Sequence, residues 1–151
     1  MTGYQNSINI LVYEDTEKFF PVLAVNLLAY RYIEGYLETD EEAVINRLNS
    51  KEIDVFVCDV TMKTDKIIDR LIKLSDSNQE PAIICIAESN VLEKSNRLAE
   101  VNQFAFLNAD DLDDIDIDAV IHQAAEYKLN VLETGKKDQI EKVDKRLLIM
   151  Q

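Results

Sequence analysis

Short apolar runs alternate with longer amphipathic stretches along most of this chain, and the alternation predicts a fold of strands and helices. Four runs are continuously apolar or rich in β-branched residues and are predicted as strands: 8–13, 53–58, 82–87 and 104–107. Residues 33–38 are predicted as a fifth, weaker strand. Apolar positions at helical spacing predict helices between and after them: near 20–28, 40–48, 65–74, 91–101, and from the Asp-rich segment to about 132. Strands without a polar face are covered on both sides, as in parallel sheets. The pattern therefore indicates a doubly wound α/β fold with five parallel strands and helices on both faces.

Composition limits the size and the class of partner. The 151 residues correspond to one ordinary domain, which we assign to residues 1–134, followed by a short extension over 135–151. With 29 acidic and 16 basic residues the net charge is −13, and such a surface repels phosphate backbones and anionic lipids. We therefore expect no nucleic-acid binding by this segment and no membrane binding. No secretory signal or membrane-length apolar run is evident, so a cytoplasmic location is predicted.

The cysteines and the histidine carry little chemistry. Cys58 and Cys85 lie within apolar runs, and this predicts buried, reduced thiols. His122 is the only histidine, so it has no second imidazole with which to share a metal.

Acidic residues follow two of the predicted strands. Glu14 and Asp15 end the first strand, and Asp59 ends the third. The carboxyl ends of parallel strands meet at one edge of the sheet, so these three carboxylates are expected to converge there. Mutual repulsion of crowded carboxylates is relieved by a cation or by a raised pKa. A hard divalent ion, Mg²⁺ above all, suits such oxygen ligands.

Four segments together resemble the receiver domain of response regulators, over residues 8 to about 132: Ile10–Asp15, Asp54–Asp59, Pro81–Glu88 and Phe104–Leu107. The resemblance implies a flavodoxin-like fold with strand order 2-1-3-4-5. It also implies that Asp59 accepts a phosphoryl group from a histidine kinase. In that family Glu14, Asp15, Asp59 and the carbonyl of Thr61 would hold Mg²⁺.

Two positions depart from that family. Ile86 stands where the family has Thr or Ser, and Ala109 stands where it has Lys. Phe106 keeps the aromatic residue that moves in the family, although it could equally be a fixed core residue. Phosphoryl transfer depends on positioning and charge neutralisation, which the missing hydroxyl and ammonium normally provide.

These departures predict a degenerate receiver, a signalling module that acts mainly through protein–protein interaction and is not an enzyme. One alternative is an atypical response regulator that is still phosphorylated within a two-component phosphorelay. A second alternative is a small flavodoxin-like enzyme or nucleotide binder. The chain has only 3 Gly, too few for a glycine-rich phosphate loop, and its 1 His leaves no visible nucleophile–base pair, so both features argue against this alternative.

Two further segments leave alternatives open. Six of the nine residues in 110–118 are Asp, which indicates a helix cap with a solvated turn, or else an anionic docking face for a basic partner. In the extension, Ile140, Val143 and Leu147 have the spacing of a coiled-coil seam. The extension is therefore a helical linker or a homodimer contact, or it packs back onto its own domain.

Overall fold

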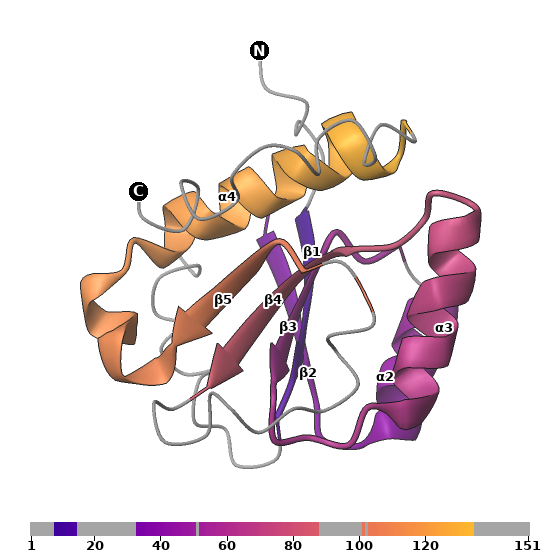
Figure 1. Ribbon diagram of the computed structural model, residues 1–151, viewed down its shortest axis with the longest axis horizontal. Coiled ribbons are helices and arrows are strands. Elements are labelled where there is room, and N and C mark those ends of the chain that lie inside the picture. The colour runs from indigo at the N-terminus through magenta and orange to yellow at the C-terminus, as the bar shows by residue number, and fades with distance from the viewer. Residues whose placement is uncertain (1–7, 15–32, 51, 88–100, 102, 135–151) are drawn as a thin grey trace.

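A five-stranded parallel sheet forms the centre of the computed structural model (Figure 1), which describes residues 8–14, 33–50, 52–87, 101 and 103–134. The strands run in the order β2-β1-β3-β4-β5. Every neighbouring pair is parallel. The strand bounds are β1 Ile8–Tyr13, β2 Ile33–Glu38, β3 Val55–Asp59, β4 Ala82–Ala87 and β5 Ala105–Asn108. The predicted fold class and strand order are thus confirmed.

Helices cover both faces of this sheet. The described helices are α2 Glu41–Ser50, α3 Asp65–Asp76, the 3₁₀ helix η3 Ala109–Asp114, α4 Ile117–Tyr127 and the π-helical turn η4 Lys128–Leu132. In Figure 1, α4 lies on one side of the sheet, and α2 and α3 lie together on the other. The predicted helices near 20–28 and 91–101 fall outside the described residues, except for Val101.

Two hydrophobic clusters result from the alternation of side chains along each strand. Ile10 and Val12 of β1 face the cluster that includes α4, whereas Leu11 and Tyr13 face the cluster beneath α2 and α3. Burying both faces removes apolar surface from water on each side, at roughly 25 cal/mol per Å². This explains why the central strands β1, β3 and β4 show almost no polar face in the sequence.

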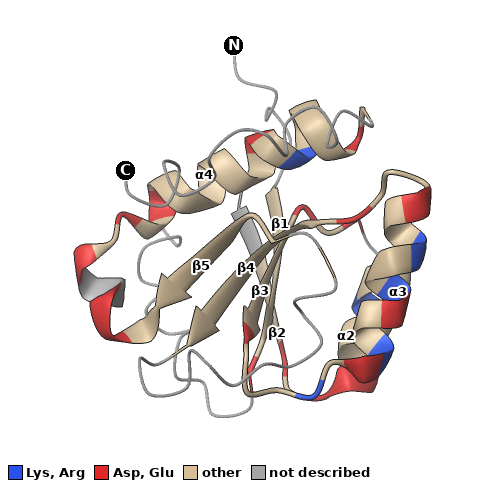
Figure 2. Ribbon diagram, viewed as in Figure 1, with Lys and Arg blue, Asp and Glu red and all other residues tan. Residues whose placement is uncertain are grey.

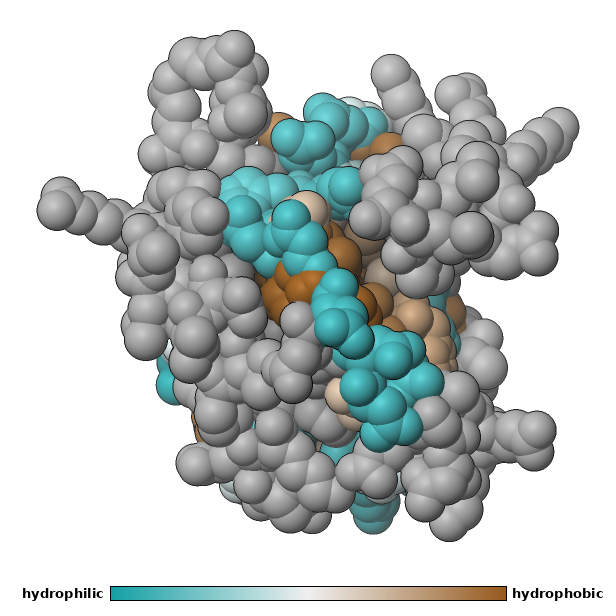
Figure 3. All heavy atoms as spheres, turned by 90° about the vertical axis from the view of Figure 1, so that its left-hand side faces the viewer, coloured by the Kyte–Doolittle hydropathy of each residue, from teal (hydrophilic) through white to brown (hydrophobic). Residues whose placement is uncertain are grey.

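The last predicted helix begins within the Asp-rich segment and reaches residue 132, as α4 followed by η4. The chain forms η3, breaks, and then begins α4 after Asp116, whose Oδ1 accepts a hydrogen bond from the Ala119 backbone N–H at 3.1 Å. An aspartate cap satisfies one of the free N–H groups at the helix start. The Asp-rich segment therefore supplies a cap and a turn, as the first of its two interpretations predicts. Hydrophilic residues overlie hydrophobic ones on the side of the molecule that η3 occupies (Figure 3).

One helix cap comes from a distant part of the sequence. Asp40 caps its own helix, α2, by accepting from the Ala43 N–H at 2.9 Å. The next residue, Glu41, is buried, and its Oε2 accepts from the backbone N–H groups of Lys66 and Ile67 at 2.6 and 3.2 Å. These bonds cap α3, whose N-cap residue makes no side-chain cap bond of its own.

Within the described residues, no helix is long and apolar enough to cross a membrane.

Candidate functional site

The carboxyl edge of the sheet brings two of the predicted acidic residues together. Tyr13 of β1 pairs in register with Cys58 of β3, so the next residues along, Glu14 and Asp59, lie beside each other. Glu14 is completely buried and Asp59 is 5% exposed. Figure 2 shows acidic residues where these strands end. Asp15, the third predicted ligand, lies outside the described residues.

The loop after β3 holds one oxygen of the Asp59 carboxylate. Its Oδ1 accepts hydrogen bonds from the backbone N–H of Thr61 at 2.9 Å and from the Thr61 hydroxyl at 2.8 Å. The Met62 N–H also bonds to the Asp59 carbonyl at 3.1 Å, closing a tight turn. The Oδ2 atom accepts no hydrogen bond from the described residues, so it is the oxygen available to a cation or to a phosphoryl donor.

A tyrosine that the sequence pattern marked only as a strand residue anchors the same loop. The Tyr13 hydroxyl, which comes from the strand beside β3, donates to the Lys63 carbonyl at 2.8 Å. The Tyr13 ring is buried in the cluster beneath α2 and α3. No periodicity distinguishes this hydroxyl from that of any other strand tyrosine, and only the fold brings its partner within reach.

Beside Asp59 lies a fully buried isoleucine. Asp59 pairs in register with Ile86 of β4, and the Val60 N–H bonds to the Ile86 carbonyl at 3.1 Å. The Ile86 side chain is 0% exposed and belongs to the hydrophobic cluster on the α4 face. An aliphatic side chain cannot donate a hydrogen bond, so the hydroxyl that the resemblance to receivers implies at this position is absent.

The next strand ends with another apolar residue. Ala109 begins η3 directly after β5, and it packs partly buried against the cluster on the α4 face. The Asn108 Oδ1 accepts from the Asp110 N–H at 2.9 Å and so turns the chain into η3. Phe106 lies on the opposite face of β5, partly buried against the cluster beneath α2 and α3.

The described ligands at the acidic edge, Glu14 and Asp59, are of the kind that a hard divalent cation binds. Glu14 and Asp59 supply carboxylate oxygens from adjacent strand ends, and Asp59 has one oxygen without a hydrogen bond there. Carboxylates of this kind are the ligands that Mg²⁺ takes in proteins, together with waters. Among the described residues, no three Asp, Glu, His or Cys side chains lie close enough together to hold a metal ion. Asp15 is not one of the described residues.

The thiols and the imidazole take no part in this edge. Cys58 and Cys85 are free and buried, as predicted, and burial raises the pKa of Cys85 to about 12. The pKa of Cys58 is also raised, by burial first and then by Cys85 and Asp59. His122 lies on α4, where its Nδ1 is 3.0 Å from Asp118 Oδ1.

Comparison with solved structures identifies the fold. The chain matches no protein-family profile and no curated protein. It superposes on the signal receiver domain of an HD domain-containing protein from Pseudomonas fluorescens Pf-5 with a TM-score of 0.61 and 16% identity, covering 83% of this chain and 100% of that one. A sensor protein from Polaromonas sp. JS666 gives a TM-score of 0.57 and 16% identity, covering 80% and 98%.

A third match contains a modified acceptor. A response regulator from Burkholderia pseudomallei, solved with a phosphorylated aspartic acid, a calcium ion and citrate, gives a TM-score of 0.55 and 13% identity, covering 90% of this chain and 75% of that one. Together with the strand order 2-1-3-4-5, these matches show that the chain has the fold of response-regulator receiver domains.

Proposed function

We propose that this chain is a receiver-like signalling module that retains the acceptor aspartate but acts mainly through protein–protein interaction. The observation that carries the proposal is the register pair of Asp59 and Ile86, a carboxylate beside a fully buried aliphatic side chain. The partner would be another signalling protein, or a histidine kinase, in the cytoplasm. The receiver fold of the structural neighbours supports a signalling module over an enzyme with its own substrate.

The missing contacts explain why switching by phosphate would be weak. A phosphoryl group on Asp59 would carry charge that a receiver neutralises with a lysine and orients with a hydroxyl. Ile86 and Ala109 provide neither, so a phosphorylated and a free Asp59 would make similar contacts with strands β4 and β5. A ligand shifts a conformational equilibrium only by its difference in affinity for the two states. We therefore expect the protein to hold one conformation and to signal by binding.

A small-molecule phosphodonor with Mg²⁺ tests this proposal against the atypical phospho-acceptor. We expect intact mass spectrometry to detect little protein carrying the added mass of one phosphoryl group. The Asp59→Asn variant is the control for phosphorylation at other sites. Stoichiometric modification of the wild type that is lost in Asp59→Asn would overturn the proposal in favour of a competent response regulator.

Weak binding of Mg²⁺ or Mn²⁺ at the acidic edge is part of the proposal. Glu14, Asp15, Asp59 and the Thr61 carbonyl are the proposed ligands, and the bound ion would neutralise the carboxylates. A ligand that binds only the folded state stabilises it by mass action, so divalent metal should raise the melting temperature. Asp59→Asn should abolish the rise. An unchanged response in that variant, or no rise at millimolar metal, would contradict this prediction.

For residues 135–151 we propose a helical linker or dimerisation segment. Ile140, Val143 and Leu147 lie outside the described residues, and their spacing alone supports the proposal.

A further inference from the structure

A pocket of about 540 Å³ lies at the amino-terminal edge of the sheet, opposite Asp59. Its walls include Ile53 before β3, Pro81 before β4 and the C-terminal ends of α2 and α3. This volume lies within the range of small-molecule sites. Nothing in the proposed signalling function uses it.

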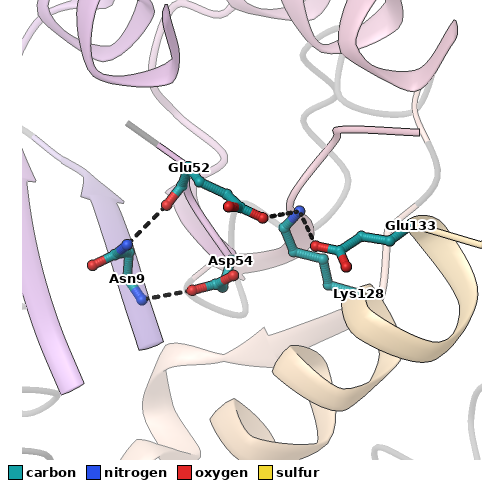
Figure 4. A network of polar contacts seen from close by, with 5 residues as sticks. All are labelled: Asn9, Glu52, Asp54, Lys128 and Glu133. Carbon is teal, nitrogen blue, oxygen red and sulfur yellow. Dashed lines mark hydrogen bonds and ion pairs between the residues drawn. The ribbon is translucent and has the colours of Figure 1, made fainter. Parts of the chain in front are cut away.

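A buried lysine with incomplete hydrogen bonding lines this pocket. The Lys128 side chain is 1% exposed. Figure 4 shows its Nζ directed toward Glu133 and Glu52, at 3.3 Å from Glu133 Oε1 and 3.8 Å from Glu52 Oε1. An ammonium has three donors, and charged hydrogen bonds are normally about 2.7–2.9 Å long. Both contacts are long, so the part of the chain that the structure describes leaves the Lys128 ammonium with unused capacity to donate hydrogen bonds.

An arginine from another element lines the same pocket. The Nε of Arg70 in α3 is buried and has no acceptor among the described residues. A buried donor without a partner destabilises the folded state. Two cationic groups with unused donors therefore border one cavity, and a ligand with an anionic acceptor would satisfy both.

The negative groups around the pocket restrict the charge of that ligand. Glu52 and Glu133 also line it, so among the described residues the ionised side chains that line the pocket balance to zero. The carbonyl ends of α2 and α3 add partial negative charge, which favours cations. A dianion such as phosphate would be repelled by these groups, whereas a ligand with one positive and one negative charge would be stabilised at both ends.

We propose that this pocket binds a free amino acid with an aliphatic side chain. The α-carboxylate would accept hydrogen bonds from Arg70 and Lys128, and the α-ammonium would pair with Glu52. The aliphatic side chain would lie against Leu48 and Leu74, which provide an apolar wall.

Titration of the ¹⁵N-labelled full chain with L-leucine tests the proposal by NMR. We expect saturable shifts of the Ile53, Leu74 and Gln79 amides, with a dissociation constant of about 1 mM or below. N-acetyl-leucine lacks the ammonium and leucinamide lacks the carboxylate, so each should bind at least about tenfold more weakly. Equal binding of N-acetyl-leucine would instead identify a site for a peptide C-terminus and would overturn the free amino acid as ligand.

Variants locate the contact. Arg70→Gln should weaken L-leucine binding at least about tenfold, because it removes the positive charge that would pair with the carboxylate. Glutamine keeps most of the side-chain length, which limits repacking of the pocket. Lys73→Gln, an exposed change on the same helix, should leave binding unchanged. Lys128→Met provides a second test and should also weaken binding. Asp59→Asn should have no effect, which keeps this proposal separate from the proposed function. Absence of saturable shifts in the wild type, or equal losses in Arg70→Gln and Lys73→Gln, would overturn it.

Discussion

The double variant Ile86→Thr/Ala109→Lys is expected to respond to beryllium fluoride with Mg²⁺, whereas the wild type responds little. Beryllium fluoride on Asp59 mimics a phosphoryl group, and the introduced hydroxyl and ammonium would add a hydrogen bond and a charge beside it. Such contacts, made in only one of two conformations, bias the equilibrium between them. NMR shifts in the double variant should spread from Asp59 to Phe106 and the face of β5. In the wild type they should stay within the acidic edge.

A matched control separates chemistry from repacking. Ile86→Val/Ala109→Met has nearly the same shapes as the double variant but supplies neither hydroxyl nor ammonium. We expect its spectra to change no more than those of the wild type. Widespread shifts in the wild type itself would show a working switch, and equal responses of the two double variants would show that the missing contacts are not the cause.

Removal of Lys128 should have the largest effect on stability. Lys128→Ala leaves a cavity and deprives buried Asp54 of its nearby positive charge, so it should lower the free energy of unfolding by about 3 kcal/mol. Lys128→Met removes the same charge but fills most of the volume, so it should be about 1–2 kcal/mol less destabilising than Lys128→Ala, the difference being the cavity. Urea unfolding of both variants, with exposed Lys73→Met as the control, measures this difference.

The stability deficit of Lys128→Met should depend on pH. Burial raises the pKa of Asp54 above 3.8, while the Asn9 N–H, at 2.8 Å from Asp54 Oδ2, and the charge of Lys128 lower it. For a group with a raised folded-state pKa, the contribution to stability is present at low pH and is lost as the pH rises through that pKa. Without Lys128 the folded-state pKa of Asp54 rises further, so the deficit should grow from about pH 4 toward neutrality. A deficit that is constant with pH would show that Asp54 and Lys128 are not coupled.

The fold was largely predictable because it follows from local patterns. Apolar runs such as 82–87 are long enough for one strand and lack a polar face, which leaves a parallel sheet as the simple solution. The limits of β3 and β5 differ from the predicted ones by one or two residues. Asp54 lies just before β3, although its backbone N–H still bonds to the Asn9 carbonyl. The helix predicted from the Asp-rich segment to residue 132 begins at Ile117, after the cap at Asp116, and continues to Leu132 through the π-helical turn η4.

Sequence by itself determined the sheet, its two covered faces and the convergence of Glu14 and Asp59 at one edge, because each depends on residue type and on position within a strand. Only the tertiary structure decided which distant groups meet. Glu41 caps α3 from the start of α2, Tyr13 anchors the loop at Lys63, and Lys128 lies buried beside Asp54 and the pocket lined by Arg70. These contacts join residues 25 to more than 70 positions apart. Their partners are set by the packing of whole elements, which no local pattern encodes.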